Sequence, residues 1–138
     1  MLAVYRALSA SHQIPNFPEK LSIIGLAESA DGFHFENRRP LITPEAPWER
    51  FGCEDPRITK LGDNYYIFYT ALSEFPFRSE GIKTALVKTK DFKTLERHPV
   101  TPFNAKGMAL FPEKIGGKFA VVFSVNTDRP PAKIAFAF

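Results

Sequence analysis

At residues 61–69 the chain reads Leu-Gly-Asp-Asn-Tyr-Tyr-Ile-Phe-Tyr, a tight turn that leads into a run of aromatic and β-branched residues. Gly and Asn tolerate the positive φ that hairpin turns require, and the run after them has high β propensity. A related segment at residues 115–123 reads Ile-Gly-Gly-Lys-Phe-Ala-Val-Val-Phe. The two segments predict two similar β-hairpins, one in each half of the chain.

A second pair of segments repeats outside these hairpins. Residues 26–44 and 86–102 share their order of strand, aspartate turn, short strand and an exit with two prolines, at a nearly constant offset. Residues 2–7 resemble the second strand of the hairpin, and residues 22–27 follow as the third strand of that unit. The chain therefore contains units of roughly 55 to 60 residues with about four strands each, close to the period of a β-propeller blade.

The fold class follows from these repeats and from the near absence of helical periodicity. The 12 prolines and the β-forming runs interrupt every long window in which apolar residues could recur at helical spacing. We predict an all-β fold, a single incomplete propeller domain over residues 1–138. Its parts are the remainder of blade 1 at about 1–50, blade 2 at about 51–105 and the start of blade 3 at about 106–138. A β-sandwich with two similar hairpins is the alternative.

The predicted blades do not add up to a ring. Propellers usually have four to eight blades, and this chain holds about two to two and a half. The chain starts inside one blade at the strand of Tyr5 and stops inside another at residues 134–138, which leaves open strand edges at both ends. We expect a fragment of a larger enzyme, a homo-oligomer, or a complementing chain that covers these edges.

Composition excludes several classes of protein. The chain has 138 residues, 44% of them hydrophobic, but no apolar run long enough to span a bilayer and no secretory-signal pattern, so we expect no membrane partner and a cytoplasmic location. The net charge is only +3 and the basic residues are scattered, which argues against a nucleic-acid partner. The single cysteine, Cys53, is expected to be a buried small hydrophobe. His12, His34 and His98 lie too far apart to predict a metal site.

An acidic motif, Phe-Gly-Cys-Glu-Asp-Pro-Arg-Ile-Thr, directly precedes the first hairpin at residues 51–59. Pro56 lacks an N–H group and favours an extended backbone at Asp55, so we expect a rigid strand entry here. In an extended chain Glu54 and Asp55 point to opposite faces, and Arg57 shares the face of Asp55. One acid can then face a pocket while the other braces the scaffold. A surface turn with a weak Asp–Arg pair is the alternative.

Taken in order, these motifs identify the chain as similar to glycoside hydrolase family 130, the β-mannoside phosphorylases and related mannosidases built on a five-bladed propeller. The resemblance covers nearly the whole chain and is carried by residues 4–7, 25–35, 52–58, 65–71, 104–106 and 110–115.

The resemblance implies an inverting phosphorolysis of β-mannosides that yields mannose 1-phosphate, with a small carbohydrate and inorganic phosphate as substrates and no cofactor. Asp55 matches the catalytic acid, whose proton reaches the glycosidic oxygen through a substrate hydroxyl. We expect its side chain to face a sugar-sized hollow at the propeller axis. The matched motifs further imply substrate- or phosphate-binding roles for Arg6, Glu54, Arg57, Lys106 and Glu113. Arg38 and Arg39 are unmatched basic residues on an expected solvated loop, with undetermined roles.

The chain departs from the family pattern at two places. Phe123-Ser124 stands where many members have His-Arg, and Lys106-Gly107 stands where members often have Lys-Asp. The loss of two phosphate donors weakens the case for phosphorolysis. Hydrolysis, which needs a second carboxylate about 6.5–9.5 Å from the acid, therefore stays an alternative. A non-catalytic, truncated propeller that binds glycans is the other.

Overall fold

The computed structural model describes residues 1–9 and 14–138, and within them the chain forms strands with only two single-turn 3-10 helices. The all-β prediction is therefore confirmed. The elements are β1 (Leu2–Leu8), β2 (Ser22–Glu28), β3 (Glu36–Ile42), η1 (Pro47–Glu49), β4 (Gly52–Leu61), β5 (Asn64–Leu72), η2 (Ser79–Gly81), β6 (Ile82–Thr89), β7 (Glu96–Pro99), β8 (Ala105–Leu110), β9 (Val121–Val125) and β10 (Lys133–Ala137).

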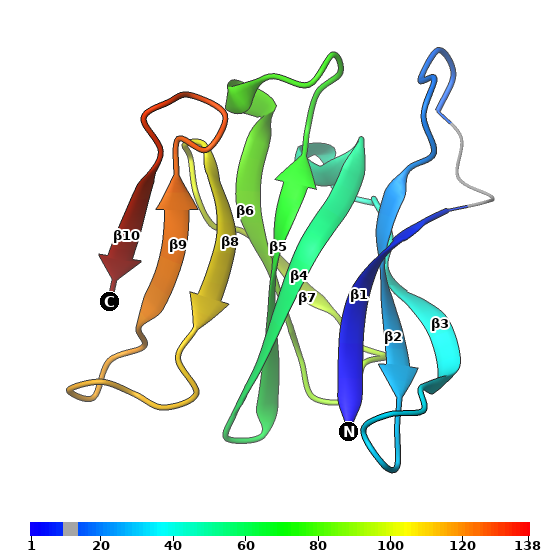
Figure 1. Ribbon diagram of the computed structural model, residues 1–138, viewed down its shortest axis with the longest axis vertical. Coiled ribbons are helices and arrows are strands. Elements are labelled where there is room, and N and C mark those ends of the chain that lie inside the picture. Colours follow the sequence, from blue (N-terminus) through cyan, green and yellow to red (C-terminus); the bar gives the residue numbers. More distant parts are fainter. Residues whose placement is uncertain (10–13) are drawn as a thin grey trace.

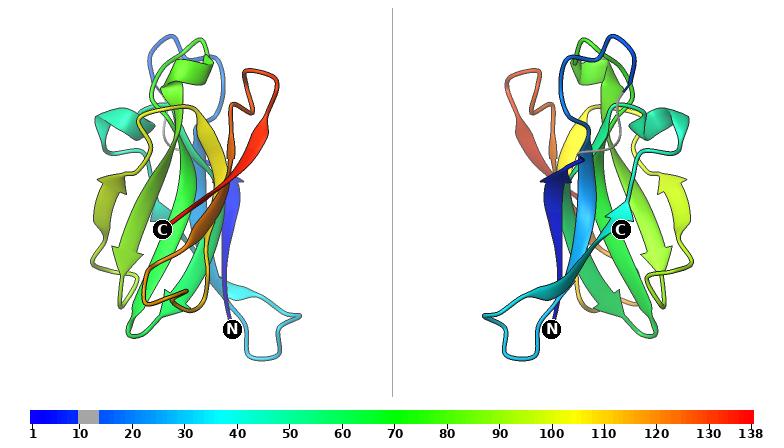
Figure 2. Two further views of the ribbon diagram at one scale, coloured as in Figure 1. Left: turned by 90° about the vertical axis from the view of Figure 1, so that its left-hand side faces the viewer. Right: turned by 90° about the vertical axis from the view of Figure 1, so that its right-hand side faces the viewer.

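Most strands pair with the strand before or after them in the chain (Figure 1). One sheet has the order β1-β2-β4-β5-β6-β7 with β3 also on β2, and a second sheet has the order β10-β9-β8. All pairs are antiparallel except one parallel bridge between Ser22 and Gly52, which joins the group β1–β3 to the group β4–β7. Over the described residues these groups lie beside one another and do not close into a ring (Figures 1 and 2).

Both predicted tight turns are present. Leu61 pairs with Asn64 across the turn between β4 and β5, and Gly62 has the positive φ, 60°, that the turn needs. Ile115 and Lys118 form the corresponding bridge in the second copy. That copy is less regular, because β9 begins only at Val121, some way after its turn.

Two aspartate turns show that the repeat is structural. One carboxylate oxygen of Asp31 accepts hydrogen bonds from the N–H groups of Phe33 and His34, both at 2.8 Å. The carboxylate of Asp91, the matching aspartate of the second copy, accepts the equivalent bonds from Lys93 and Thr94, both at 2.9 Å. The connections β2–β3 and β6–β7 are therefore equivalent.

The core lies on both faces of the group β4–β7. Alternate residues of β5 point to opposite sides, as in any strand. Ile67, Tyr69 and Ala71 pack toward the first group of strands, whereas Phe68 and Tyr66 pack against the sheet of β8–β10. Full burial of each large apolar side chain stabilises the fold by about 1.5–3 kcal/mol. The middle group is thus held between its two neighbours by hydrophobic layers.

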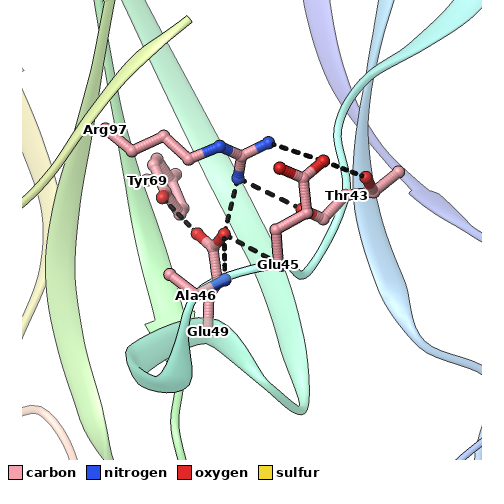
Figure 3. A network of polar contacts seen from close by, with 6 residues as sticks. All are labelled: Thr43, Glu45, Ala46, Glu49, Tyr69 and Arg97. Carbon is pink, nitrogen blue, oxygen red and sulfur yellow. Dashed lines mark hydrogen bonds and ion pairs between the residues drawn. The ribbon is translucent and has the colours of Figure 1, made fainter.

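A buried carboxylate joins η1 to the middle group (Figure 3). The Glu49 side chain is fully buried, and its oxygens accept hydrogen bonds from the Tyr69 hydroxyl, from Arg97 at 2.5 Å and from two backbone N–H groups at 3.1 and 3.2 Å. Arg97 also pairs with Glu45 at 3.3 Å. Burial raises the pKa of Tyr69, and the nearby Glu49 charge raises it further, so the hydroxyl stays a donor. This network fixes the segment that leads into β4.

Among the described helices, none is long and apolar enough to cross a membrane. His12, one of the three histidines considered above, lies outside the described residues.

Candidate functional site

Strand β4 has a one-residue bulge at the predicted acid. Glu54 pairs with Thr70 and Arg57 pairs with Phe68, so three steps along β4 match two steps along β5. Asp55 takes up the extra residue with φ of 49°, in the left-handed region. The extended backbone predicted for Asp55 is therefore wrong. Pro56 has no N–H group for the ladder, and the strand bulges there instead of continuing the regular pairing.

Asp55 is one of five described non-glycine residues with a positive φ, and the other four are three asparagines and Phe92. A non-glycine residue in this region costs about 1–3 kcal/mol, and such residues concentrate at functional sites. Aspartate is one of the few side chains that adopts the conformation readily. The Asp55 side chain is exposed, and no hydrogen bond or ion pair from residues 1–9 or 14–138 reaches its carboxylate. This carboxylate is free to contact a ligand.

Glu54, in contrast, is held by two other strands. Its Oε1 atom lies 2.6 Å from Nη2 of Arg6 on β1 and accepts a hydrogen bond from the Ser22 hydroxyl on β2 at 2.6 Å. Arg6 also donates to Ser22 at 3.2 Å. The Glu54 side chain is 17% exposed and that of Arg6 is 48% exposed. Glu54 therefore braces the junction of three strands beside Asp55.

Ser22 is a residue that sequence reasoning missed. A serine at the start of a strand carries no signal of a site. Only the parallel bridge between Ser22 and Gly52 brings it to the acidic motif, and that bridge joins segments that are far apart along the chain.

Arg57 is exposed, as the surface-turn alternative expects, but it does not pair with Asp55. Its Nη1 atom donates to the carbonyl oxygen of Pro56 at 3.1 Å. No carboxylate within the described part of the chain forms an ion pair with it. The Arg57 guanidinium thus lies next to the bulge without a carboxylate partner among the described residues.

Lys106 belongs to a second polar cluster, at the start of β8. Its ammonium group lies 2.7 Å from Asp128, and the Asn104 amide donates to the other Asp128 oxygen at 2.9 Å. Burial works to raise the pKa of Asp128, but the hydrogen bonds from Lys106 and Asn104 outweigh it, so the pKa lies below its usual range. Ser124 pairs with Lys106 in register, so a guanidinium at that position would lie beside Lys106. Asp128 had no signal in the sequence.

The other residues singled out in the sequence, Glu113, Arg38 and Arg39, belong to neither cluster. Glu113 is exposed, in the turn region between β8 and β9. Arg38 and Arg39 are exposed on strand β3 and not on a loop, which corrects the expectation for them. Arg39 pairs with Leu26, toward the far end of β2 from Ser22.

Both clusters lie at the same end of the molecule. The last residues of β1 and the first residues of β2, β4 and β8 meet at the upper end in Figure 1, and β4 packs between β1 and β8. Four phenylalanines from three loops also gather there, with ring centroids 5.0 to 6.3 Å apart: Phe17, Phe51, Phe75 and Phe77. They support the segment that enters β4.

The acidic motif also contains the thiol of Cys53. Cys53 is fully buried, as the sequence predicts, and burial raises the pKa of its thiol, so the thiol stays protonated. Across residues 1–9 and 14–138, no three His, Cys, Asp or Glu side chains are grouped so that they could hold a metal ion.

Comparisons of the sequence with known proteins find similar proteins that are all named as mannoside phosphorylases. The sequence model of glycoside hydrolase family 130, which is described as beta-1,4-mannooligosaccharide phosphorylase, matches residues 2–137. A Beta-1,2-mannobiose phosphorylase from Listeria innocua is 43% identical over 102 residues, which are 72% of this chain and 27% of that protein. A 1,2-beta-oligomannan phosphorylase from a Thermoanaerobacter species is 32% identical over 136 residues, 97% of this chain and 44% of that protein.

The solved structures agree with these relatives. The structure of the Listeria innocua enzyme in complex with beta-1,2-mannobiose superposes with a TM-score of 0.72 at 34% identity, over 88% of this chain and 35% of that one. The chain thus spans between a quarter and a half of the length of the curated relatives it matches.

Proposed function

The chain belongs to glycoside hydrolase family 130, and from this we propose that it acts in the phosphorolysis of β-mannosides with Asp55 as the proton donor. The observation that carries the proposal is the bulge in β4, which presents one strained, exposed and unpartnered carboxylate beside a braced one. Inorganic phosphate is the second substrate, and the reaction needs no cofactor.

In the proposed reaction, a phosphate oxygen attacks the anomeric carbon of the mannosyl unit from the face opposite the glycosidic bond. That bond breaks as the glycosidic oxygen takes up a proton, which comes from Asp55 by way of a substrate hydroxyl. The products are mannose 1-phosphate with inverted configuration and the shortened saccharide. Because phosphate is already an anionic nucleophile, the reaction needs one acid and cationic side chains that bind phosphate, but no general base.

The three cations that the family motifs assign to the site, Arg6, Arg57 and Lys106, have different capacities for phosphate. Arg6 and Lys106 each have a carboxylate partner, at 2.6 and 2.7 Å, that neutralises part of their charge. Among the described residues, the Arg57 guanidinium hydrogen-bonds only to the Pro56 carbonyl. We therefore assign the first phosphate contact to Arg57, since a guanidinium can bind two phosphate oxygens at once. Arg6, Lys106 and Glu113 are secondary contacts, and Glu54 supports the backbone of Asp55.

For the linkage, the similar proteins favour β-1,2. The relatives from Listeria innocua and Thermoanaerobacter are named for β-1,2-linked mannosides, at 43% and 32% identity. The family description names β-1,4-linked mannooligosaccharides. We propose β-1,2-mannobiose and short β-1,2-oligomannans as substrates, with the β-1,4 series as the comparison in the assay.

Hydrolysis of the same substrates is the second candidate, and one observation favours it. Ser124 stands opposite Lys106, where the family pattern often supplies an arginine, so this strand offers no second cation to phosphate. A hydrolase would release free mannose instead of mannose 1-phosphate.

We further propose that the three groups of strands are blades of a five-bladed propeller, with boundaries at about residues 50 and 105. Within the described chain β1 pairs only with β2, and β10 only with β9. Further strands, from a second copy of this chain or from a complementing chain, would cover those edges and complete the hollow around Asp55. The cytoplasmic location stays a prediction.

Substitution of Asp55 by Asn tests the proposal. Asn adopts the left-handed backbone as readily as Asp, so Asp55→Asn keeps the bulge and removes only the proton. We expect mannose 1-phosphate formation from β-1,2-mannobiose and phosphate to fall about 10²–10⁴-fold, with an unchanged melting temperature. Asp63→Asn, in the exposed turn of the same hairpin, is the matched control and keeps its activity. The proposal is wrong if the unsubstituted chain releases neither mannose nor mannose 1-phosphate from either series, or if Asp55→Asn is fully active.

A further inference from the structure

We propose that a cavity between the η2–β6 turn, the segment before β8 and the turn after β9 is a saccharide subsite, separate from Asp55, for a sugar unit beyond the cleaved pair. The inference deepens the proposed function and rests on it for the substrate class.

The cavity has a volume of about 350 Å³ and lies between loops of neighbouring groups of strands. Figure 1 shows these loops at the upper end, where β4 and β8 begin, so the cavity opens at the same end as Asp55. The volume falls in the range of pockets that bind small ligands. The residues that carry the argument are Glu80, Lys83, Phe103, Asn104, Asn126 and Arg129.

An aromatic ring forms one side of the cavity. Phe103 is 46% exposed, although it stacks on Phe123 with ring centroids 6.4 Å apart and an interplanar angle of 29°. The partner ring restrains its orientation while much of its surface stays open. A restrained, exposed ring beside hydrogen-bonding side chains suits the apolar face of a pyranose.

The charged groups of the lining balance one another. Arg129 and Glu80 form an ion pair at 2.6 Å, and Lys83 is the lining cation that has no ion pair with any residue in the described part of the chain. A site for phosphate would instead present several unpaired cations. Paired charges and amides supply both donors and acceptors, as sugar hydroxyls require. This balance favours a neutral saccharide over a free anion.

The buried residue Asn104 connects the cavity with Lys106, one of the proposed phosphate contacts. Asn104 is 6% exposed, and its amide donates to the carbonyl oxygens of Ser79 and Ile82 at 3.1 Å and to Asp128 at 2.9 Å. Asp128 in turn pairs with Lys106 at 2.7 Å. A saccharide seated against Asn104 therefore lies one side chain away from the Lys106–Asp128 pair.

The test compares chain lengths of one substrate series. Phe103→Ala is assayed in the full chain with β-1,2-mannobiose and β-1,2-mannotriose, and binding of the trisaccharide is followed by NMR shifts of the Asn126 and Phe103 backbone amides. Phe119→Ala is the matched control, because Phe119 is 44% exposed, packs on Tyr66 and does not line the cavity. Thermal melts of both variants verify folding.

We expect Phe103→Ala to raise KM for the trisaccharide about five- to tenfold and to leave kcat and the disaccharide KM unchanged. The subsite proposal is wrong if Phe103→Ala and the parent have the same KM for the trisaccharide. It is also wrong if the trisaccharide shifts amide signals only outside this cavity. The two proposals fail in different ways. An inactive parent chain whose Asn126 amide still shifts with the trisaccharide contradicts phosphorolysis alone. An active chain without that shift contradicts only the subsite.

Discussion

At the residue scale, the conformation of Asp55 shows how one proline changes a strand. Pro56 cannot donate to the ladder with β5, and the register shifts by one residue beside it. The extra residue needs a positive φ, which most side chains avoid and Asp accepts. The chemistry of the motif and its backbone geometry therefore depend on the same two neighbouring residues.

Glu49 is the residue whose loss should destabilise the fold most clearly. Its carboxylate is fully buried, whereas the Arg97 side chain is 13% exposed. In Glu49→Gln, Arg97 loses its buried partner and the Tyr69 hydroxyl loses a charged acceptor. Breaking a buried pair costs about 3–5 kcal/mol, so we expect a fall in melting temperature of about 10–17 °C, measured by circular dichroism.

Glu45→Gln is the matched control for this prediction, because Glu45 pairs with the same arginine at 3.3 Å but its side chain is 65% exposed. An exposed pair contributes about 0–1 kcal/mol, so its melting temperature should hardly change. Equal effects of the two substitutions would show that burial of Glu49 does not matter.

At the element scale, the start of β4 depends on a close approach of backbones. Gly52 has φ of 147°, and a Cβ atom there would lie 3.2 Å from Leu72 Cδ1 and 3.4 Å from Ser22 Cβ. The absence of a side chain lets β4 meet β2 at the Ser22–Gly52 bridge. That contact brings Ser22 within hydrogen-bond distance of Glu54.

Gly52→Ala should therefore disturb the site as well as the fold. The strained backbone and the contact with Ser22 predict a loss of about 1–3 kcal/mol in the free energy of unfolding, measured in urea. They also predict a loss of phosphorolysis in the protein that remains folded, because the Arg6–Ser22–Glu54 cluster shifts. Gly62→Asn is the comparison, since Gly62 has open space around it and Asn tolerates its φ of 60°. A stable, fully active Gly52→Ala variant would contradict this account of the β2–β4 junction.

At the scale of the whole molecule, the outer face of the second sheet is apolar and uncovered. Ile134, Phe136 and Phe138 alternate along β10 and just beyond its end, and they are 83%, 48% and 69% exposed. Ala135, between the first two, packs toward the core on the other face. β10 pairs only with β9 in the described chain, so an open backbone edge lies next to this apolar face. Such surfaces favour association with another sheet.

We expect the chain to self-associate with increasing concentration, as followed by light scattering after size-exclusion chromatography. The double substitution Ile134→Lys and Phe136→Glu places charges on this face and should shift the chain to monomers. Phe33→Glu, at an 86% exposed ring in the turn between β2 and β3, should leave the distribution unchanged. A parent chain that stays monomeric at all concentrations would contradict the covering of β10 by a second copy of this chain.

Local signals in the sequence were sufficient for the all-β class, the tight turns and the repeat. Turn residues such as Gly62 and Asp31, and the β-forming run of β5, act over a few neighbouring positions and so can be read directly. The tertiary structure alone decided which polar groups pair: Ser22 and Arg6 with Glu54, Asp128 with Lys106, and Arg97 with Glu49. These partners lie on different elements and far apart along the chain. Their contacts depend on strand register and on how the sheets pack, which no short stretch of sequence specifies.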